Sequence, residues 1–213
     1  MEAYYHNPVV TAWYFIYDKT KQGVNGMPDI KIDTSTITIE TKRLILRPFV
    51  ESDLEDMYVY ASVPGVGEMA GWPHHTSIET TKMILQSFVD GNEVLAIFHK
   101  PENKVIGSFG IHKSWANDDE RFKHLKSKEI GYVLSKDFWG QGLVPEATKA
   151  VIDYGFNDLG IEAFTCCHFV ENAQSRRVIE KTGFEFVMQS TYYSSQMDKT
   201  FDDMKYILIG NRS

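Results

Sequence analysis

The sequence has no long hydrophobic run, and it contains only two cysteines. Its uninterrupted apolar stretches are a few residues long, well short of the roughly 20 residues that span a bilayer. No basic segment at its start leads into an apolar one, as a secretory signal would require. Cys166 and Cys167 are adjacent, so they cannot join distant segments as a disulfide framework does. We therefore expect a cytoplasmic protein without a membrane contact.

The sequence also lacks the residue spacing of metal sites and of serine nucleophiles. The two cysteines do not have zinc-ligand spacing, and His112, His124 and His168 have no companion at such a spacing. No serine lies in a nucleophile-elbow pattern. We expect no metal and no covalent acyl-enzyme.

Basic residues are fewer than acidic ones. Lysine and arginine number 22 against 29 for aspartate and glutamate, which gives a formal charge of −7. This balance argues against charge-driven binding to nucleic acid and suits a cationic substrate better. With 43% hydrophobic and 24% charged residues, the chain of 213 residues has the composition of an ordinary globular protein with one core.

Residues 1–35 differ from the rest of the chain. They carry an aromatic run at residues 13–17, and Gly23, Gly26 and Pro28 then interrupt any periodicity. We interpret residues 1–35 as an N-terminal extension and residues 36–213 as the main domain. The aromatic run is expected to cover an apolar surface of its own domain or of a second subunit, so a homodimer is one hypothesis.

Residues 36–213 alternate between strand and helix patterns. For example, Leu54, Met57, Tyr58 and Ala61 form one apolar stripe at helical spacing. Strands are predicted over residues 44–48, 94–99, 105–111, 129–134, 164–170, 184–188 and 204–209, and helices over residues 53–61, 78–88, 144–158 and 173–181. A charged and aromatic loop, residues 114–126, is long for a strand connection and could select substrate. This order predicts an α/β or α+β fold, a sheet covered by helices.

A glycine-containing turn joins the strand at 129–134 to the helix at 144–158. Such a turn points successive backbone N–H groups outward at the positive end of a helix, where an anionic phosphate fits. Gly140 and Gly142 allow close backbone approach. The segment lacks the Lys-Ser/Thr ending of a nucleotide P-loop and the third glycine of a dinucleotide fingerprint, so a bare turn is the alternative.

Several motifs in combination resemble the GNAT superfamily of acetyl-CoA-dependent N-acetyltransferases, and more closely its Rim-type ribosomal-protein N-acetyltransferase branch. The resemblance covers about residues 38–211. The motifs are Thr41-x-Arg43-Leu44-x-Leu46-Arg47, Gly71-Trp72-Pro73, Glu129-Ile130-Gly131-Tyr132, Trp139-Gly140-Gln141-Gly142, Glu146-Ala147 and Asn172-x-x-Ser175-x-Arg177-Val178-x-Glu180-Lys181-x-Gly183-Phe184.

This resemblance implies a mixed, mostly antiparallel central sheet with a splayed pair of strands, and acetyl-CoA as cosubstrate. The coenzyme pyrophosphate would lie on the turn after Trp139, on the amides of Gly140, Gln141, Gly142, Leu143 and Val144. Backbone groups near Val133 and Leu134 would bond the pantetheine arm, as would Asn172, and Arg177 would approach a phosphate. A helix cap is the alternative role for Asn172, and a surface salt bridge is the alternative for Arg177.

The resemblance also suggests catalytic groups. Glu129 would be the base that deprotonates the amine through a water, and either Ser175 or Tyr132 would protonate the departing thiolate. A solvent-facing glutamate and a helix-surface serine are the alternatives. Trp72, His74 and His75 lie in the loop that lines the acceptor cleft of relatives, although ordinary loop histidines would look the same.

The expected function is N-acetylation of a primary amine by direct attack on acetyl-CoA. A protein N-terminal α-amine is the favoured acceptor. Small amines, including polyamines and aminoglycosides, are the alternative acceptors, because one fold and one cofactor site can serve many of them. A non-catalytic coenzyme A binding module that acts through a partner is a second hypothesis. A protein that binds a different phosphate ligand is a third.

Overall fold

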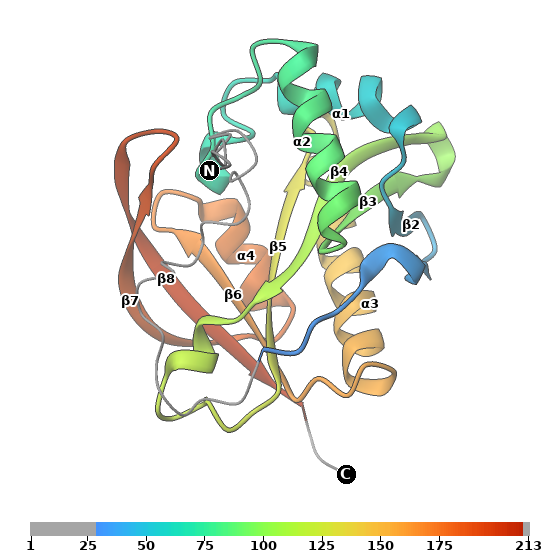
Figure 1. Ribbon diagram of the computed structural model, residues 1–213. Helices are drawn as coiled ribbons and strands as arrows, with labels where there is room; N and C mark the ends of the chain where they lie inside the picture. Colours follow the sequence, from blue (N-terminus) through green and yellow to red (C-terminus); the bar gives the residue numbers. More distant parts are fainter. Residues whose placement is uncertain (1–28, 211–213) are drawn as a thin grey trace, which may run out of the picture.

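A computed structural model describes residues 29–210, which form one eight-stranded sheet between two layers of helices (Figure 1). The strand order is β1-β2-β3-β4-β5-β6-β8-β7. Within the described residues every pair of neighbouring strands is antiparallel except β5 and β6. The predicted fold, a mixed and mostly antiparallel sheet flanked by helices, is confirmed. The aromatic run at 13–17 and its proposed partner contact lie outside the described residues.

The elements follow the predicted order along the chain. The strands are β1 (Ile39–Glu40), β2 (Leu44–Pro48), β3 (Val94–His99), β4 (Lys104–Lys113), β5 (Ser127–Leu134), β6 (Ala163–Phe169), β7 (Glu185–Ser194) and β8 (Lys199–Ile209). The α-helices are α1 (Leu54–Ala61), α2 (Ile78–Gly91), α3 (Leu143–Asn157) and α4 (Ala173–Lys181). None of the helices in this part of the chain has the length and apolar character needed to cross a membrane.

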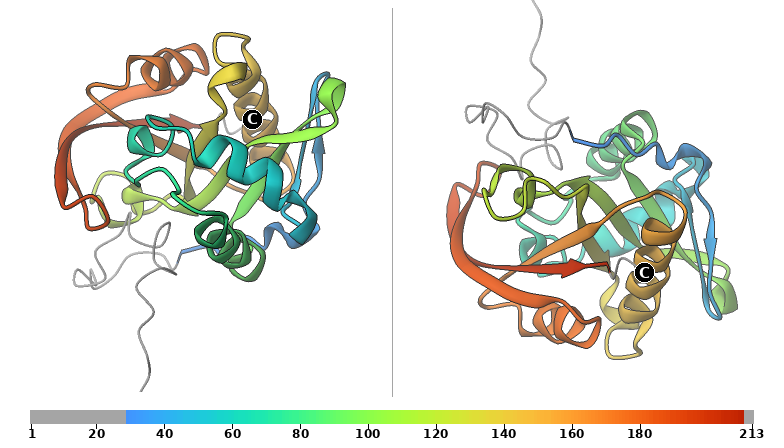
Figure 2. Two further views of the ribbon diagram at one scale, coloured as in Figure 1. Left: turned by 90° about the horizontal axis from the view of Figure 1, so that it is seen from above. Right: turned by 90° about the horizontal axis from the view of Figure 1, so that it is seen from below.

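Helices α1 and α2 cover one face of the sheet (Figure 2). Ser77 caps α2 by accepting a hydrogen bond from the amide of Thr80, and Asn92 ends the helix in a left-handed conformation. The buried stripe of α2 includes Ile84, Leu85 and Phe88 at helical spacing, and it packs with α1 against the middle strands. We call this side of the sheet the α1–α2 face.

Helices α3 and α4 cover the opposite face, where the largest apolar cluster lies (Figure 2). Asn172 caps α4, because its side chain accepts a hydrogen bond from the amide of Ser175. The chain leaves α4 through Gly183, whose φ of 91° is accessible to glycine without strain. Leu143, Ala147 and Val151 of α3 are buried in this cluster. We call this side the α3–α4 face.

Strands β5 and β6 pair over a short stretch and then diverge (Figure 1). Their parallel register joins residues Ser127 to Glu129 of β5 with Ala163 to Thr165 of β6, whereas β5 continues to Leu134. The second half of β5 therefore lacks β6 as a neighbour on that edge. This is the splayed strand pair that the resemblance implied, and it leaves backbone groups of β5 available to a ligand.

The last two strands are longer than predicted. The sequence indicated strands only over residues 184–188 and 204–209, but β7 reaches Ser194 and β8 begins at Lys199. A register shift between Phe186 and Met188 changes which side chains share a face. The simple alternation on which strand prediction depends is therefore lost in the middle of β7.

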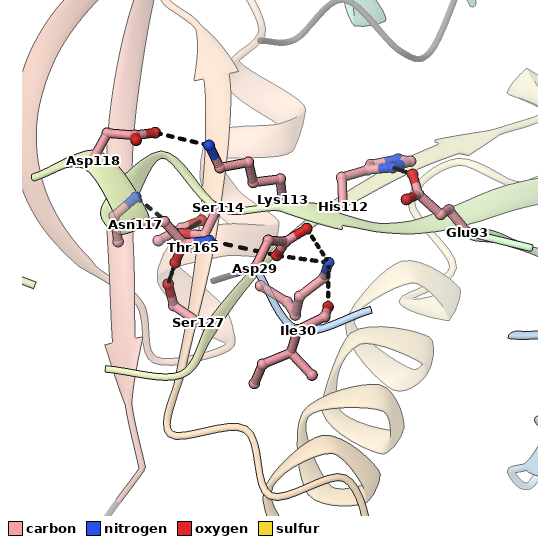
Figure 3. Close-up of polar contacts among 12 residues, drawn as sticks. Asp29, Ile30, Glu93, His112, Lys113, Ser114, Asn117, Asp118, Ser127 and Thr165 are labelled. Carbon is pink, nitrogen blue, oxygen red and sulfur yellow. Dashed lines mark hydrogen bonds and ion pairs between the residues drawn. The ribbon is translucent and has the colours of Figure 1, made fainter. Parts of the chain in front are cut away.

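Residues 29–35, which the sequence assigned to the extension, pack against the described domain. Ile32 joins the α3–α4 cluster, Thr34 is buried, and the Thr34 amide donates to the carbonyl of Asn92. The Nζ atom of the buried Lys128 lies 3.2 Å from Asp29 Oδ1 and donates to the carbonyl of Ile30 at 3.0 Å. Figure 3 labels Asp29 and Ile30, the two partners. This segment therefore contributes to the core.

Candidate active site

The predicted phosphate turn connects β5 to α3 and exposes backbone amides. A short 3₁₀ helix, Lys136–Phe138, follows β5, and Gly140 and Gly142 then adopt φ values of 74° and 73°. Both values lie in the left-handed region that glycine tolerates best. Gly142 is the N-cap of α3 and provides no capping side chain, so the first N–H groups of the helix remain available to an anion.

An ion pair fixes this turn to the start of the sheet. Glu146, in the first turn of α3, accepts hydrogen bonds from Thr41 Oγ1 at 2.6 Å and from Arg43 Nε at 2.7 Å. Arg43 Nη1 also donates to the carbonyl of Gln141 at 2.9 Å. These bonds from Thr41 and Arg43 outweigh partial burial and hold the pKa of Glu146 below its usual range. The Thr-x-Arg motif thus has a visible structural role, which sequence reasoning did not identify.

A groove of about 810 Å³ runs from this turn between β5 and α4. The loop between α1 and α2 forms its other wall through Gly65, Val66, Met69 and Ala70. Among the residues that the sequence singled out, the groove is lined by Tyr132, Val133, Leu134, Trp139, Gly140, Gly142, Leu143, Val144, Asn172, Ser175 and Arg177. Gln141 is not part of the lining, and its side chain instead donates to the carbonyl of Asp137.

Alternate residues of β5 direct their backbone groups to opposite edges. The amide of Ser135 donates to Ile106 in β4, whereas the carbonyl of Lys126 accepts from Glu162 at the start of β6. Continuing this alternation, Tyr132 and Leu134 face the gap, and Val133 faces β4. Trp139 Nε1 already donates to the Leu134 carbonyl at 2.8 Å. The free backbone groups at the gap are therefore those of Tyr132 and the amide of Leu134, and Val133 contributes its side chain.

The structure joins the two predicted thiolate-protonating groups. Tyr132 OH lies 3.0 Å from Ser175 Oγ, so the two hydroxyls share a hydrogen bond at the wall of the groove. Burial raises the pKa of Tyr132 well above its usual value, which keeps the phenol protonated. Asn172 is a helix cap, which was the alternative role predicted for it, and its Nδ2 atom also donates to the carbonyl of Met69. Arg177 is exposed at the groove wall.

Glu129 lies on the opposite face of β5 from Tyr132 and is only 4% exposed. Thr165 Oγ1 donates to Glu129 Oε2 at 3.2 Å, and Cys167 Sγ lies 3.7 Å from the same oxygen. Burial, followed by the charge of Asp203, raises the pKa of Glu129 to about 7. It is therefore not the solvent-facing glutamate of the alternative reading. Its carboxyl bridges β5 and β6 where their pairing ends.

The loop residues expected at the acceptor cleft do not line the groove. Trp72 is buried with the α1–α2 cluster, in contact with Gly67. His75 Nδ1 lies 2.8 Å from Thr81 Oγ1, and burial lowers its pKa to about 4, so its ring is neutral at neutral pH. His74 Nδ1 lies 2.7 Å from Glu68 Oε1. These contacts stabilise the loop, and a direct substrate contact stays a prediction.

Sequence reasoning missed three neighbours of Glu129. These neighbours are Thr165 and Cys167 of β6 and Asp203 of β8. The sequence showed only that these residues belong to strands with alternating side chains. Knowledge of which strands are adjacent was needed to bring them to β5. In the described part of the chain, no three histidine, cysteine, aspartate or glutamate side chains are arranged to hold a metal ion.

Comparison with known proteins shows the family of this chain. The acetyltransferase (GNAT) domain profile matches residues 43–185, more than half of the sequence. The chain therefore belongs to the GNAT acetyltransferase family, whose members use acetyl-CoA. It is similar to the uncharacterised N-acetyltransferase YoaA of Bacillus subtilis, with 27% identity over 179 residues, which cover 82% of this chain and 97% of YoaA. The protein is thus an N-acetyltransferase.

Solved structures show the same fold at low sequence identity. An acetyltransferase of the GNAT family from Bacillus anthracis superposes with a TM-score of 0.70 and 22% identity, covering 81% of this chain and 98% of that one. The ribosomal-protein-S5-alanine acetyltransferase from Vibrio fischeri gives 0.61 and 19%, covering 81% and 96%. The microcin C7 self-immunity acetyltransferase MccE, solved with acetyl-CoA and AMP, gives 0.63 and 19%, covering 79% and 93%.

Proposed function

We propose that this protein transfers the acetyl group of acetyl-CoA to the α-amine of a protein N-terminus by direct attack in a ternary complex. One observation carries the proposal: polar groups approach the β5–β6 gap from both faces of β5. Glu129 lies on the α1–α2 face, and the Tyr132–Ser175 pair lies in the groove on the other side. A base and an acid separated in this way suit an amine and a thioester that meet in the gap.

The residues of the groove fit acetyl-CoA. At Gly140 the φ is positive and no atom lies within 4 Å of the position a Cβ would occupy, so the backbone is open to a bulky anion. The amides of residues 140–144 would hold the pyrophosphate, and the exposed Arg177 would add a positive charge. Tyr132, Leu134 and Asn172 would bond the pantetheine arm through backbone groups and an amide side chain. The acetyl thioester would then lie near the Tyr132–Ser175 pair.

The reaction needs a base and an acid in opposite protonation states. A Glu129 with a pKa of about 7 is partly ionised at neutral pH and accepts a proton from the acceptor ammonium. The neutral amine attacks the carbonyl carbon, the C–N bond forms and the C–S bond breaks. Tyr132 keeps its proton up to high pH, so it can protonate the departing sulfur through or together with Ser175. The second proton of the attacking nitrogen then restores the phenol, so that one proton of the ammonium ends on Glu129 and the other, by way of Tyr132, on the sulfur.

The pKa of the base favours an α-amine over a more basic amine. A protein α-amine titrates near pH 8, about one unit above Glu129, whereas a lysine-like amine near 10.4 lies more than three units above it. Each unit of mismatch costs about 1.4 kcal/mol in the proton transfer. The similarity in fold to the Vibrio fischeri ribosomal-protein acetyltransferase agrees with this choice of acceptor.

Thiol release from acetyl-CoA tests the proposal directly. The purified protein is titrated with acetyl-CoA in a calorimeter and then assayed with two acceptor sets, short peptides with free α-amines and small polyamines or aminoglycosides. We expect binding, and faster release with the peptides. Faster release with the small amines would replace the proposed acceptor class, and binding without release from either set would favour a coenzyme A binding module. Absence of acetyl-CoA binding would overturn the assignment of the groove.

A further inference from the structure

Acetylation of a protonated amine releases one proton to solvent. The ammonium loses two protons when the amide forms, one of which ends on the coenzyme sulfur: R–NH₃⁺ + CH₃CO–S–CoA gives R–NH–COCH₃ + HS–CoA + H⁺. No electrons are transferred to or from an external partner. In the proposed function the remaining proton lies on Glu129, which is only 4% exposed. A route from Glu129 to water is therefore part of the chemistry.

His112 lies next to Glu129 on the neighbouring strand. The β4–β5 register places the two residues directly opposite each other, so their side chains share the α1–α2 face. The His112 ring folds over Gly110, where a Cβ atom would collide with its Nε2 atom. Gly110 in turn pairs with Gly131, which is partly exposed. The imidazole thus lies over a stretch of strand without side chains, beside Glu129.

Glu93 connects His112 to solvent. His112 Nδ1 lies 3.3 Å from Glu93 Oε2, and the Glu93 side chain is 38% exposed while that of His112 is 8% exposed (Figure 3). The hydrogen bond from His112 holds the pKa of Glu93 below its usual range, against the effect of burial, and Lys128 adds to this. Glu93 is therefore an ionised carboxylate that can accept a proton from the ring and exchange it with water.

The remaining neighbours of Glu129 lie on β6 and β8, and Cys167 and Lys205 among them are partly exposed. Thr165 Oγ1 lies 2.9 Å from the buried Ser114 Oγ, and Cys167 is a thiol whose pKa burial raises well above its usual value. From β8, Asp203 is itself 5% exposed, and Lys205 acts on Glu129 only through its charge. Asp203 accepts a hydrogen bond from the partly exposed hydroxyl of Ser190. Among the groups around Glu129 that the structure describes, His112 is the one bonded to a partly exposed carboxylate, which can accept a proton and release it to water.

We propose that His112 and Glu93 carry the net proton of the reaction from Glu129 to solvent. This inference rests on the proposed function. The Glu129 carboxylic acid gives its proton to His112 Nε2 through a water, Nδ1 gives its proton to Glu93 Oε2, and Glu93 releases it to solvent. The imidazole then returns to its first tautomer. His112 is thus a positioning and relay residue for the base and does not touch the acetyl group.

Proton transport by small buffers tests the relay. His112→Gln and Glu93→Gln are assayed for thiol release with the peptide acceptors, in buffers with and without added imidazole. We expect kcat to fall roughly 10- to 100-fold, with KM for acetyl-CoA unchanged and with kcat rising as imidazole is added. The wild type should not respond to imidazole. His168→Gln is the matched control, since it removes a buried histidine on the opposite face, bonded to Tyr206.

An unchanged kcat in both variants, or a loss that imidazole does not restore in either, would overturn the relay. The wild-type assay separates this failure from a failure of the proposed function, because wild-type turnover depends on the function alone. A second measurement needs no acceptor: the ¹⁵N signals of the His112 ring are followed against pH in the wild type and in Glu129→Gln. The two curves should differ if the groups exchange protons. Identical curves would contradict the proposal.

Discussion

The chemistry of Glu129 is set by the residues around it. A glutamate on an exposed strand would titrate near 4.3, but burial and the charge of Asp203 raise its pKa to about 7. The sequence predicted this residue as the base from a resemblance and offered no means to predict its pKa. That value depends on burial and on Asp203 of β8, a strand that lies far along the chain and beyond β6 in the sheet.

Glu129→Gln should remove the base while leaving acetyl-CoA binding intact. We expect kcat to fall about 10²- to 10⁴-fold, because general base catalysis by a positioned side chain contributes this much. In the wild type kcat/KM should rise with pH through about 7, since the ionised carboxylate is the active form. In Glu129→Gln, kcat/KM should no longer rise with pH near 7. Wild-type turnover in Glu129→Gln, measured by thiol release, would contradict the assignment of the base.

Asp203→Asn should move the rise of kcat/KM with pH to lower pH. The negative charge of Asp203 disfavours ionisation of Glu129, so its removal lowers the pKa of Glu129 and extends activity into acid. The pH dependence of kcat/KM measures this shift. Asp202→Asn is the control, because Asp202 is the next residue on β8, exposed and on the other face of the strand. Equal shifts in both variants would indicate a general charge effect.

At the scale of elements, the turn between β5 and α3 was the most predictable part of the site. Its glycines and its position before a helix indicated an anion site from the sequence alone, and the structure shows the left-handed glycines and the open helix end. Its attachment through Arg43 and Glu146 was not predictable in the same way, since the two residues are 103 positions apart. The conformation of the turn could be predicted from its own residues. The contacts that hold it in place could not, because they come from a strand far away in the sequence.

Gly140→Ala, compared with a control glycine, should show whether the turn binds acetyl-CoA in addition to needing a residue with positive φ. A side chain at a φ of 74° is strained by about 1 kcal/mol, although nothing nearby would clash with it. Gly160→Ala is a matched control, with a φ of 63°, equally open surroundings and a position after the far end of α3. Both variants should lose similar stability in thermal unfolding. Calorimetry should show at least about fivefold weaker acetyl-CoA binding in Gly140→Ala only.

At the scale of the whole molecule, the order of the strands in the sheet was the feature that the sequence could not predict. Helix α4 was predicted closely because the cap at Asn172 and the glycine after the helix mark its ends. The start of α2 was also predicted, and the structure shows Ser77 as its cap. The pairing of β6 with β8 rather than β7, and the bulge in β7, leave no such local mark. The same limit applies to residues 29–35, whose contacts with the core depend on Lys128 and Asn92, both far along the chain.

These contacts lead us to propose that the folding unit begins before residue 36. A chain that begins at residue 36 loses the burial of Ile32 and both partners of Lys128, whose side chain is 1% exposed. The loss of this apolar burial and of the bonds to the Lys128 ammonium should make this chain unfold at a lower temperature than one that begins at residue 29. Thermal unfolding followed by circular dichroism compares the two chains.

Lys128→Met in the shorter chain separates charge from packing. The substitution removes the orphaned ammonium and keeps an apolar side chain of similar length, so it should restore much of the lost stability. In the chain that begins at residue 29, the same substitution leaves Asp29 without its cation but exposes no new charge to the interior, because the Asp29 side chain is 29% exposed. Its effect there should be small. Equal unfolding temperatures for the two chain lengths would show instead that the boundary at residue 36 is correct. Residues 29–35 would then contact the domain without stabilising it.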